Sequence, residues 1–248
     1  NATFRADGSS NFHPDNQWGY FPSMSLGWIL SNEDFLSTSN TINFFKFRAS
    51  WGQVGNQNVG AFQYLAPIQT STTNYTFGAV EGVLTPGAYP NRLANPELGW
   101  ETSEQTNIGF DARLFNNTLS VNFDWYKKTN KDWLIVAPIL ATAGADAPFI
   151  NGGNVENTGV ELALNYNNNI GGFNYNLAVN GAYNKNTVGA IPTGDGIIHG
   201  ETNQLFDNAP EFYRSQDGFP LWYFWGFETP GVFQTQQEID DYGVQPNA

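Results

Sequence analysis

The chain has 248 residues, of which only 13% are charged, and its formal net charge is −13. This acidic balance disfavours a nucleic-acid partner, which needs a basic surface. The absence of cysteine excludes a disulfide scaffold, a thiolate metal site and a thiol nucleophile. No run of about 20 apolar residues is present, so the sequence predicts no transmembrane helix.

The polarity of the chain comes mainly from Asn, Gln, Ser and Thr, whereas a soluble domain usually carries about a quarter charged residues. This composition suits a wall with one wet face and one face that cannot bear charge. The first residues, Asn1 to Arg5, lack the basic and apolar regions of a signal peptide and look like the end of a strand. The final stretch, 242–248, is polar. We therefore expect the chain to be a piece of a longer polypeptide.

Long segments alternate apolar with polar residues, which gives a strand one apolar and one polar face. In 119–125, for example, Leu119, Val121, Phe123 and Trp125 alternate with smaller polar residues. The predicted strands, in chain order, are the strand end 1–6, then 20–30, 44–52, 102–115, 119–137, a strand holding 159–166, a strand holding 173–184, and a final one around 221–233. Residues 236–242 are expected to form one short helical turn.

The connections between these strands alternate in length. The shorter ones are 31–43, 116–118 and 167–172, and the longer ones are 53–101, 138–157 and 185–220. Outer-membrane barrels place short turns at the periplasmic end and long loops outside. A soluble β-sandwich has the same alternation of residues. The membrane interpretation is favoured because the strands exceed the usual five or six residues, the long loops lie at one end, and aromatic residues lie near the strand ends.

Several motifs resemble one family, in the expected order and over nearly the whole chain. They are Arg5–Phe12, Trp18–Ser23 with Gly27–Trp28, Phe47–Gln57, Asn95–Gly109, Asp124–Lys128, Asn154–Glu161 and Gly231–Thr235. On these residues the chain resembles the SusC/RagA-type TonB-dependent outer-membrane transporters. The resemblance implies an all-β fold, an antiparallel transmembrane β-barrel of about 22 strands whose lumen holds a plug. Residues 1–248 would form part of that barrel, without the plug domain, the TonB box and the remaining strands.

The resemblance also implies a function, the TonB-dependent import of large nutrients, glycans or peptides, across the outer membrane of a Gram-negative cell. A SusD-like surface lipoprotein would act as the lid, TonB would act through the missing plug, and outer-membrane lipid would surround the barrel. No enzymatic activity and no cofactor are implied. Two alternatives stay open: a secreted β-rich domain that binds or cleaves carbohydrate, and a surface adhesin. Dependence on detergent would separate the transporter from both.

No catalytic or metal site is predicted. The two histidines, His13 and His199, lie in expected loops far apart in sequence, and neither has a partner set that would make a triad or a metal site. Carboxylate pairs such as Glu101/Glu104 and Glu156/Glu161 invite a glycosidase interpretation, but such pairs are common in Asn-rich β proteins. The segment 193–197 lacks the alternating ligands of a calcium loop and is expected to be a plain turn.

Aromatic, Asn and Arg residues in the long loops are the candidates for substrate binding, because sugar rings stack on aromatic faces and amide and guanidinium groups bind hydroxyls. The set is Tyr64, Tyr75, Asn91 and Arg92, for which ligand binding and loop packing are equally favoured. For the cluster 222–225 we favour packing and interfacial anchoring. The charged residues of the polar face (Lys46, Arg48, Asp111, Arg113 and Glu161) are expected to form pairs within the wall or with the plug.

Overall fold

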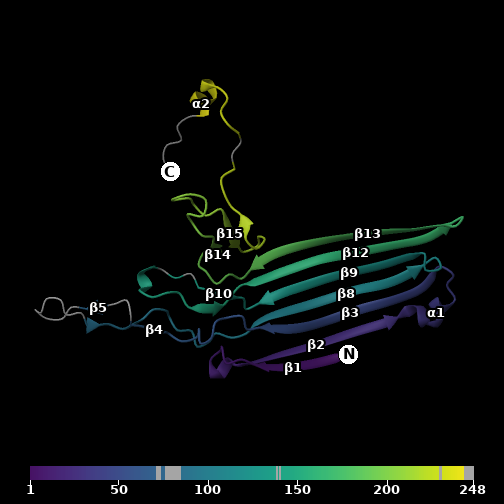
Figure 1. Cartoon of the computed structure of the whole chain (residues 1–248), viewed down its shortest axis with the longest axis horizontal. Coiled ribbons are helices and arrows are strands. Elements are labelled where there is room, and N and C mark those ends of the chain that lie inside the picture. Colours follow the sequence, from purple (N-terminus) through teal and green to yellow (C-terminus); the bar gives the residue numbers. More distant parts are fainter. Residues whose placement is uncertain (71–73, 76–84, 138, 140, 229–230, 243–248) are drawn as a thin grey trace, which may run out of the picture.

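A computed structural model describes residues 1–70, 74–75, 85–137, 139, 141–228 and 231–242. Its main feature is one sheet of long antiparallel strands, with most of the remaining chain gathered at one end of it (Figure 1). The strands of this sheet are β1 (Ala2–Gly8), β2 (Trp18–Ile29), β3 (Ile42–Asn56), β8 (Glu101–Leu114), β9 (Leu119–Lys131), β12 (Asn154–Ile170) and β13 (Phe173–Gly189).

Among the described residues, short strands form four small sheets outside the main one. They are β4 (Ile68–Gln69), β5 (Asn74–Tyr75), β6 (Thr85–Pro86), β7 (Tyr89–Pro90), β10 (Leu134–Val136), β11 (Phe149–Asn151), β14 (Ile197–His199), β15 (Tyr213–Gln216) and β16 (Tyr223–Phe224). The helices are α1 (Asp34–Ser37) and α2 (Gln236–Tyr242), with 3-10 turns at Pro14–Asn16, Leu30–Asn32 and Ala141–Ala143. In the described part of the chain, no helix has the length and apolar character needed to cross a membrane.

Neighbouring strands of the main sheet follow one another along the chain, and each pair is antiparallel, in the order β1-β2-β3-β8-β9-β12-β13. The connections β2–β3, β8–β9 and β12–β13 lie at one end of the sheet, and the longer connections β3–β8 and β9–β12 lie at the other, together with the short β1–β2 connection (Figure 1). The predicted alternation of short and long connections is therefore confirmed. Within the described residues, β1 and β13 each have a neighbour on one side only, so the sheet does not close.

The register places apolar residues of all the central strands on one face. Four consecutive rows, which we call the apolar band, carry no charged side chain. They are Leu26/Ala49/Ile108/Trp125/Val160/Tyr183, Trp28/Phe47/Phe110/Phe123/Leu162/Gly181, Phe45/Ala112/Val121/Leu164/Val179 and Leu114/Leu119/Tyr166/Leu177. The opposite side, which we call the polar face, carries the residues between them. The alternation predicted from the sequence therefore holds across the whole sheet.

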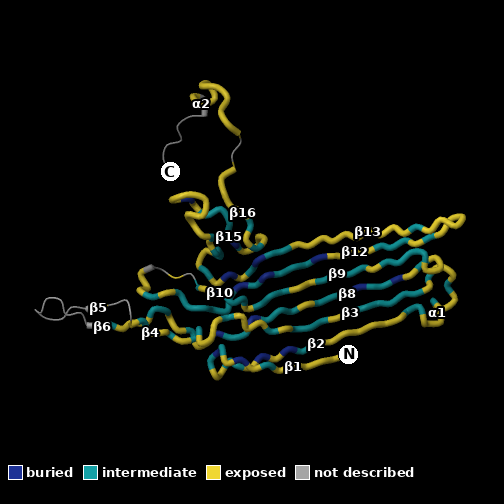
Figure 2. Tube along the Cα trace, in the orientation of Figure 1, coloured by how far each residue is buried: buried dark blue, intermediate teal, exposed yellow. Residues whose placement is uncertain are grey.

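The apolar band is not a protein core. Leu26 is 64% exposed, Leu177 60% and Val179 54%, and most of the sheet is intermediate or exposed (Figure 2). Phe47 and Phe110, which a two-layered sandwich would bury fully, are only partly buried. The most deeply buried side chains, including Phe12, Leu98 and Val188, instead lie toward the long-loop end. A soluble domain does not expose an apolar surface of this extent.

Three predicted boundaries were wrong. The strand expected over 119–137 ends at Lys131, because Asp132 adopts a positive φ of 56° and the chain then continues as β10, which pairs with β11. The turn expected over 167–172 is shorter, since β12 runs to Ile170 and only Gly171 and Gly172, both with positive φ, connect it to β13. In the described part of 221–233, a long strand is replaced by the two-residue strand β16.

The other predicted elements are confirmed with small shifts at their ends. The strand expected over 44–52 extends to Ile42–Asn56, and the strands holding 159–166 and 173–184 each have 17 residues. The helical turn expected over 236–242 is α2. Helix α1, which lies in the connection between β2 and β3, was not predicted.

Candidate functional site

A network of charged side chains crosses three strands on the polar face. The Arg48 guanidinium donates to Asp111 through Nε (2.9 Å) and Nη2 (3.0 Å), and its Nη2 also donates to Asp124 (3.0 Å). Asn122 donates to the same Asp111 carboxylate at 2.8 Å. Arg48 and Asp111 therefore pair within the wall, which is one of the two outcomes expected for the charged residues of the polar face. Charge-assisted bonds of this kind hold β3, β8 and β9 at a fixed register on this face.

A glycine makes this network possible. In the register, Gly109 lies directly between Arg48 on β3 and Asp124 on β9. A Cβ at position 109 would lie 2.4 Å from Asp124 Oδ1 and 2.5 Å from the Phe123 carbonyl oxygen. The guanidinium can therefore reach across β8 only because residue 109 has no side chain.

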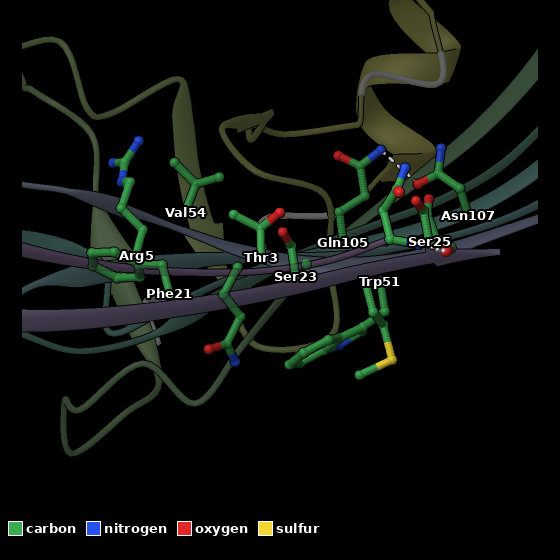
Figure 3. A pocket seen from close by; sticks show the side chains of 14 residues that line it. Thr3, Arg5, Phe21, Ser23, Ser25, Trp51, Val54, Gln105 and Asn107 are labelled. Atoms are coloured by element: carbon green, nitrogen blue, oxygen red, sulfur yellow. Dashed lines mark hydrogen bonds between the residues drawn. The ribbon is translucent and has the colours of Figure 1, made fainter.

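The polar face also contains a groove of about 510 Å³ near the long-loop end, lined by residues of β1, β2, β3 and β8. Figure 3 shows that Thr3, Ser25, Gln105 and Asn107 project from one side of the sheet, whereas Trp51 projects from the other. The Gln105 amide donates to Asn107 Oδ1 at 2.8 Å. Hydroxyl, amide and guanidinium groups line this groove, and such groups bind the hydroxyl and amide groups of polar ligands.

One end of the groove carries a cationic and aromatic pair. The Arg5 guanidinium lies 6.0 Å from the centre of the Phe21 ring and forms an ion pair with Asp7. Phe21 packs in turn against Trp100, with ring centres 5.5 Å apart. Trp100 also contacts the buried Phe12 at 5.4 Å. This aromatic cluster packs the β1–β2 connection against the long-loop end of the sheet, where Arg5 and Phe21 border the groove.

Three of the four predicted loop residues lie close together. The backbone amide of Asn95 donates to the Tyr64 carbonyl at 3.1 Å, and Arg92 Nη1 donates to Gln63, the residue before Tyr64. The Tyr64 ring contacts the His13 ring edge-on, with centres 5.6 Å apart. Residue Tyr75 belongs to β5, but its side chain lies outside the described residues.

Asn91 and Arg92 connect the loop between β3 and β8 to the loop between β9 and β12. The Asn91 carbonyl accepts from the Asp146 amide at 2.6 Å, and the Arg92 guanidinium lies 5.1 Å from the centre of the Phe149 ring. Asn91 Oδ1 and Arg92 Nε are buried and make no hydrogen bond among the described residues. These contacts are those of loop packing, and a role in substrate binding stays a prediction for the set.

The histidines differ in their surroundings. His13 lies beside Asp15, whereas His199 Nδ1 lies 3.0 Å from the Glu211 carboxylate and its Nε2 lies 3.5 Å from Asp195. The hydrogen bond with Glu211 and the nearby Asp195 raise the pKa of the His199 imidazole, although partial burial opposes them. Among the described residues, no three His, Asp or Glu side chains are arranged to hold a metal ion.

The carboxylate pairs considered from the sequence do not form acid–base pairs. Glu101 is buried on the polar face, whereas Glu104 lies on the opposite face and accepts from Lys131 at 3.0 Å. Glu156 and Glu161 also lie on opposite faces of β12, since their positions in the strand differ by an odd number. Segment 193–197 forms a turn in which the Ile197 amide donates to Thr193 Oγ1 and Asp195 Oδ1.

The expected packing of the cluster 222–225 agrees with its contacts. Trp222 contacts Tyr213, Tyr223 stacks on Phe219, and Arg214 lies 3.2 Å from the centre of the Trp225 ring. The groove residues Arg5, Gln105 and Asn107 and the network residue Asp124 were not singled out from the sequence. Their strand periodicity assigns them to the polar face, but only the register brings them together.

The family model described as "TonB dependent receptor-like, beta-barrel" matches residues 1–244. The chain belongs to this family. Its relatives include the TonB-dependent receptor P3 of Formosa agariphila, 34% identical over 239 residues, which cover 94% of this chain and 23% of that protein. Another relative, the TonB-dependent receptor SusC of Bacteroides thetaiotaomicron, is 32% identical over 199 residues, covering 78% of this chain and 19% of SusC.

Comparison with solved structures agrees with this assignment. The chain is similar to a chain of the RagAB peptide importer in its "open-open" state, with a TM-score of 0.74 and 28% identity. In the "closed-closed" state the TM-score is 0.73 and the identity 27%. Each match covers 90% of this chain and 23% of the other. The predicted SusC/RagA-type resemblance and the all-β barrel fold are confirmed, and the chain spans about a quarter or less of these relatives. TonB-dependent receptor barrels lie in the outer membrane, and the family consists of transport receptors.

Proposed function

We propose that this chain forms part of the wall of an outer-membrane importer for large polar nutrients, glycans or peptides, with import driven by TonB through a plug domain. A single observation carries the proposal. The sheet has an uncharged apolar band on one side and hydrogen-bonding side chains around a groove on the other. This is the arrangement that a barrel wall needs when it has lipid outside and a polar passage inside.

The height of the apolar band supports its contact with lipid. Its four rows extend over three steps of two residues, roughly 20 Å along a strand that rises about 3.4 Å per residue. The outward apolar band of an outer-membrane barrel is about 25 Å tall. Aromatic residues Tyr166 and Tyr175 lie at the short-turn end of the band, and Trp125 and Tyr183 lie at the other. Both sites suit an interfacial aromatic girdle.

The polar face suits the passage of a hydrated solute. Some of its charges are paired with one another, as in the Arg48, Asp111 and Asp124 network, and neutral amide and hydroxyl side chains line the groove. A glycan or a peptide needs many such weak contacts, and neither needs a covalent step. The loop residues Tyr64, Tyr75, Asn91 and Arg92 belong to the same proposal, as contacts at the outer mouth.

The relatives support the proposed substrate classes and the proposed lid. RagAB is described as a peptide importer, which supports peptides, while the resemblance to the SusC/RagA group supports a SusD-like lipoprotein as the lid and leaves glycans as the other class. Because sugars and peptide bonds use the same types of hydrogen bonds, the groove by itself favours neither.

The test is uptake of labelled oligosaccharide and peptide pools by cells that carry the intact transporter. Replacing both Gln105 and Asn107 by Leu removes two hydrogen-bonding groups from the groove at nearly constant volume. We expect uptake of one pool to fall several-fold, because each lost hydrogen bond to a bound solute costs about 0.5–1.5 kcal/mol. The matched control is Thr106→Val, which lies between them on the opposite face.

Uptake should also disappear when TonB is deleted, and the amount of folded transporter in the membrane should be the same for all variants. Unchanged uptake of both pools without the transporter or without TonB would refute the importer. An equal loss from Thr106→Val and from the double variant would contradict the assignment of the faces.

A further inference from the structure

A cluster of basic side chains lies directly beyond the apolar band, on the same face and at the long-loop end. Lys127 on β9 and Lys185 on β13 are both partners of Thr158 on β12 in the register. Each lysine lies two residues beyond an aromatic residue of the band, Trp125 or Tyr183, and so on the same side of its strand. We call Lys127, Thr158 and Lys185 the lysine row.

We propose that the lysine row binds the phosphate head group of an anionic lipid in the outer leaflet of the membrane. The proposal rests on the membrane placement of the apolar band given above. Because the long loops of an outer-membrane barrel lie outside the cell, the lysine row is at the level where the acyl chains of the outer leaflet end and the head groups begin.

The spacing suits one phosphate. The two lysines lie on strands that flank β12, about 9.6 Å apart for two strand spacings. Two long, flexible side chains from these positions can converge on a group above Thr158, whose hydroxyl is a further donor. A lysine ammonium binds phosphate as a point charge, and basic pockets at membrane surfaces bind anionic head groups.

The charge of the cluster is also appropriate. Lys127 Nζ contacts Glu156 Oε2 at 2.8 Å, and Thr158 Oγ1 donates to Glu156 Oε1 at 3.3 Å. For Lys185, which is exposed, no ion pair occurs among the described residues. Two lysines and one glutamate leave one positive charge for the ligand. The Lys127–Glu156 pair is half exposed, and pairs of this kind are weak, so a phosphate can replace the carboxylate.

Basic residues are few in this acidic chain, and two of them lie directly beyond the apolar band. The chain has ten basic residues against 23 acidic ones. The four rows of the apolar band hold none of them, and Lys127 and Lys185 occupy the first row above it. Lys128, which is next to Lys127 in sequence, belongs to the polar face because successive side chains of a strand alternate. This neighbour provides a control that changes the same net charge on the other side of the wall.

The experiment measures binding of fluorescent lipid A in mixed micelles to the purified, intact transporter. The double variant Lys127→Gln/Lys185→Gln should bind lipid A at least about tenfold more weakly, since lysines near a membrane surface attract anionic head groups. Lys128→Gln should bind like the unmodified protein. Glu156→Gln removes the competing carboxylate and should bind more tightly. Dephosphorylated lipid A should bind all variants equally weakly.

Equal binding of phosphorylated and dephosphorylated lipid A would overturn the proposal, and so would an equal loss in Lys128→Gln. An unchanged affinity in the double variant would overturn it too, provided that heat-modified migration shows a folded barrel. Uptake assays keep this outcome separate from the proposed function. If the transporter imports its substrate but does not prefer the phosphorylated lipid, the lipid site is refuted and the proposed function stands. If it prefers the phosphorylated lipid but imports neither pool, the proposed function is refuted and the lipid site stands.

Discussion

The network around Arg48 depends on one residue that has no side chain. Gly109 separates two strands whose charged side chains meet above it, so that a guanidinium from β3 reaches a carboxylate on β9. The same position is therefore sensitive to a change as small as a methyl group.

Replacing Gly109 by Ala should destabilise the transporter by about 1–3 kcal/mol, because the added Cβ overlaps Asp124 and the Phe123 carbonyl and forces the strands apart. Urea unfolding of the intact transporter in detergent measures this loss. Gly181→Ala is the control, since a Cβ at residue 181 has no described atom within 4 Å. If both variants unfolded at the same urea concentration, the close approach at Gly109 would have no energetic importance.

His199 gives the small sheet of β14 and β15 a pH dependence. The hydrogen bond with Glu211, together with Asp195, raises the pKa of the imidazole above the usual value near 6.5. A raised pKa in the folded state means that the contribution of His199 to stability is complete below the unfolded pKa. It is then lost as the pH rises through the folded pKa.

We therefore expect hydrogen exchange in Ile197–His199 and Tyr213–Gln216 to become faster above that pH, after correction for the intrinsic effect of pH. His199→Gln should remove this dependence, whereas His13→Gln should leave it unchanged, because His13 belongs to a different contact. A protection that stays constant from acid to alkaline pH in the unmodified protein would show that the ion pair does not stabilise this sheet.

The sequence predicted which side of a strand each charged residue occupies, but not its partner. Periodicity of two places Lys46, Arg48 and Asp111 on the polar face, since it needs only local backbone geometry. The contact of Arg48 with Asp124 depends on the register of three strands, and register is a property of the assembled sheet. For the same reason, the sequence did not predict that Glu211 contacts His199, which lies 12 residues before it in the chain.

At the scale of strands, length and alternation were predictable, whereas the ends were not. The long strands were found because their apolar residues continue without interruption on one side. The strand expected over 119–137 was too long, since its apolar residues continue beyond Asp132, where a positive φ turns the chain away from the sheet. The long strand predicted around 221–233 was wrong because its aromatic residues pack as a cluster, with rings against Tyr213, Phe219 and Arg214.

The two faces of β12 should respond differently to charge. Leu162 is a member of the apolar band, and the next residue, Ala163, lies on the polar face beside Asn122 and Asn180. Leu162→Arg should cost about 2–4 kcal/mol, the cost of a basic residue near the middle of the membrane on the lipid side. Ala163→Arg should cost far less. Folding into lipid vesicles, followed by urea titration, measures both, and a similar cost for the two variants would contradict the assignment of the faces.

For the whole molecule, the open sheet and the exposed apolar band both favour association with other chains or with lipid. Strands β1 and β13 have unpaired edges within the described residues, and large apolar side chains cover one side of the sheet. An unpaired long edge recruits other strands, and an apolar surface of this size recruits lipid or other proteins. A complete barrel removes both features, because further strands pair with the edges and lipid covers the band.

The 248-residue chain produced alone should therefore associate in plain buffer and stay dispersed only in detergent, whereas the intact transporter in detergent should sediment as a defined species. Analytical ultracentrifugation with and without detergent measures this difference. A secreted carbohydrate-binding domain or an adhesin would instead bury its apolar residues and remain a folded monomer in water. That result, with cooperative unfolding in plain buffer, would remove the physical basis for placing the apolar band against lipid, because a stable fold would then exist without any lipid to cover it.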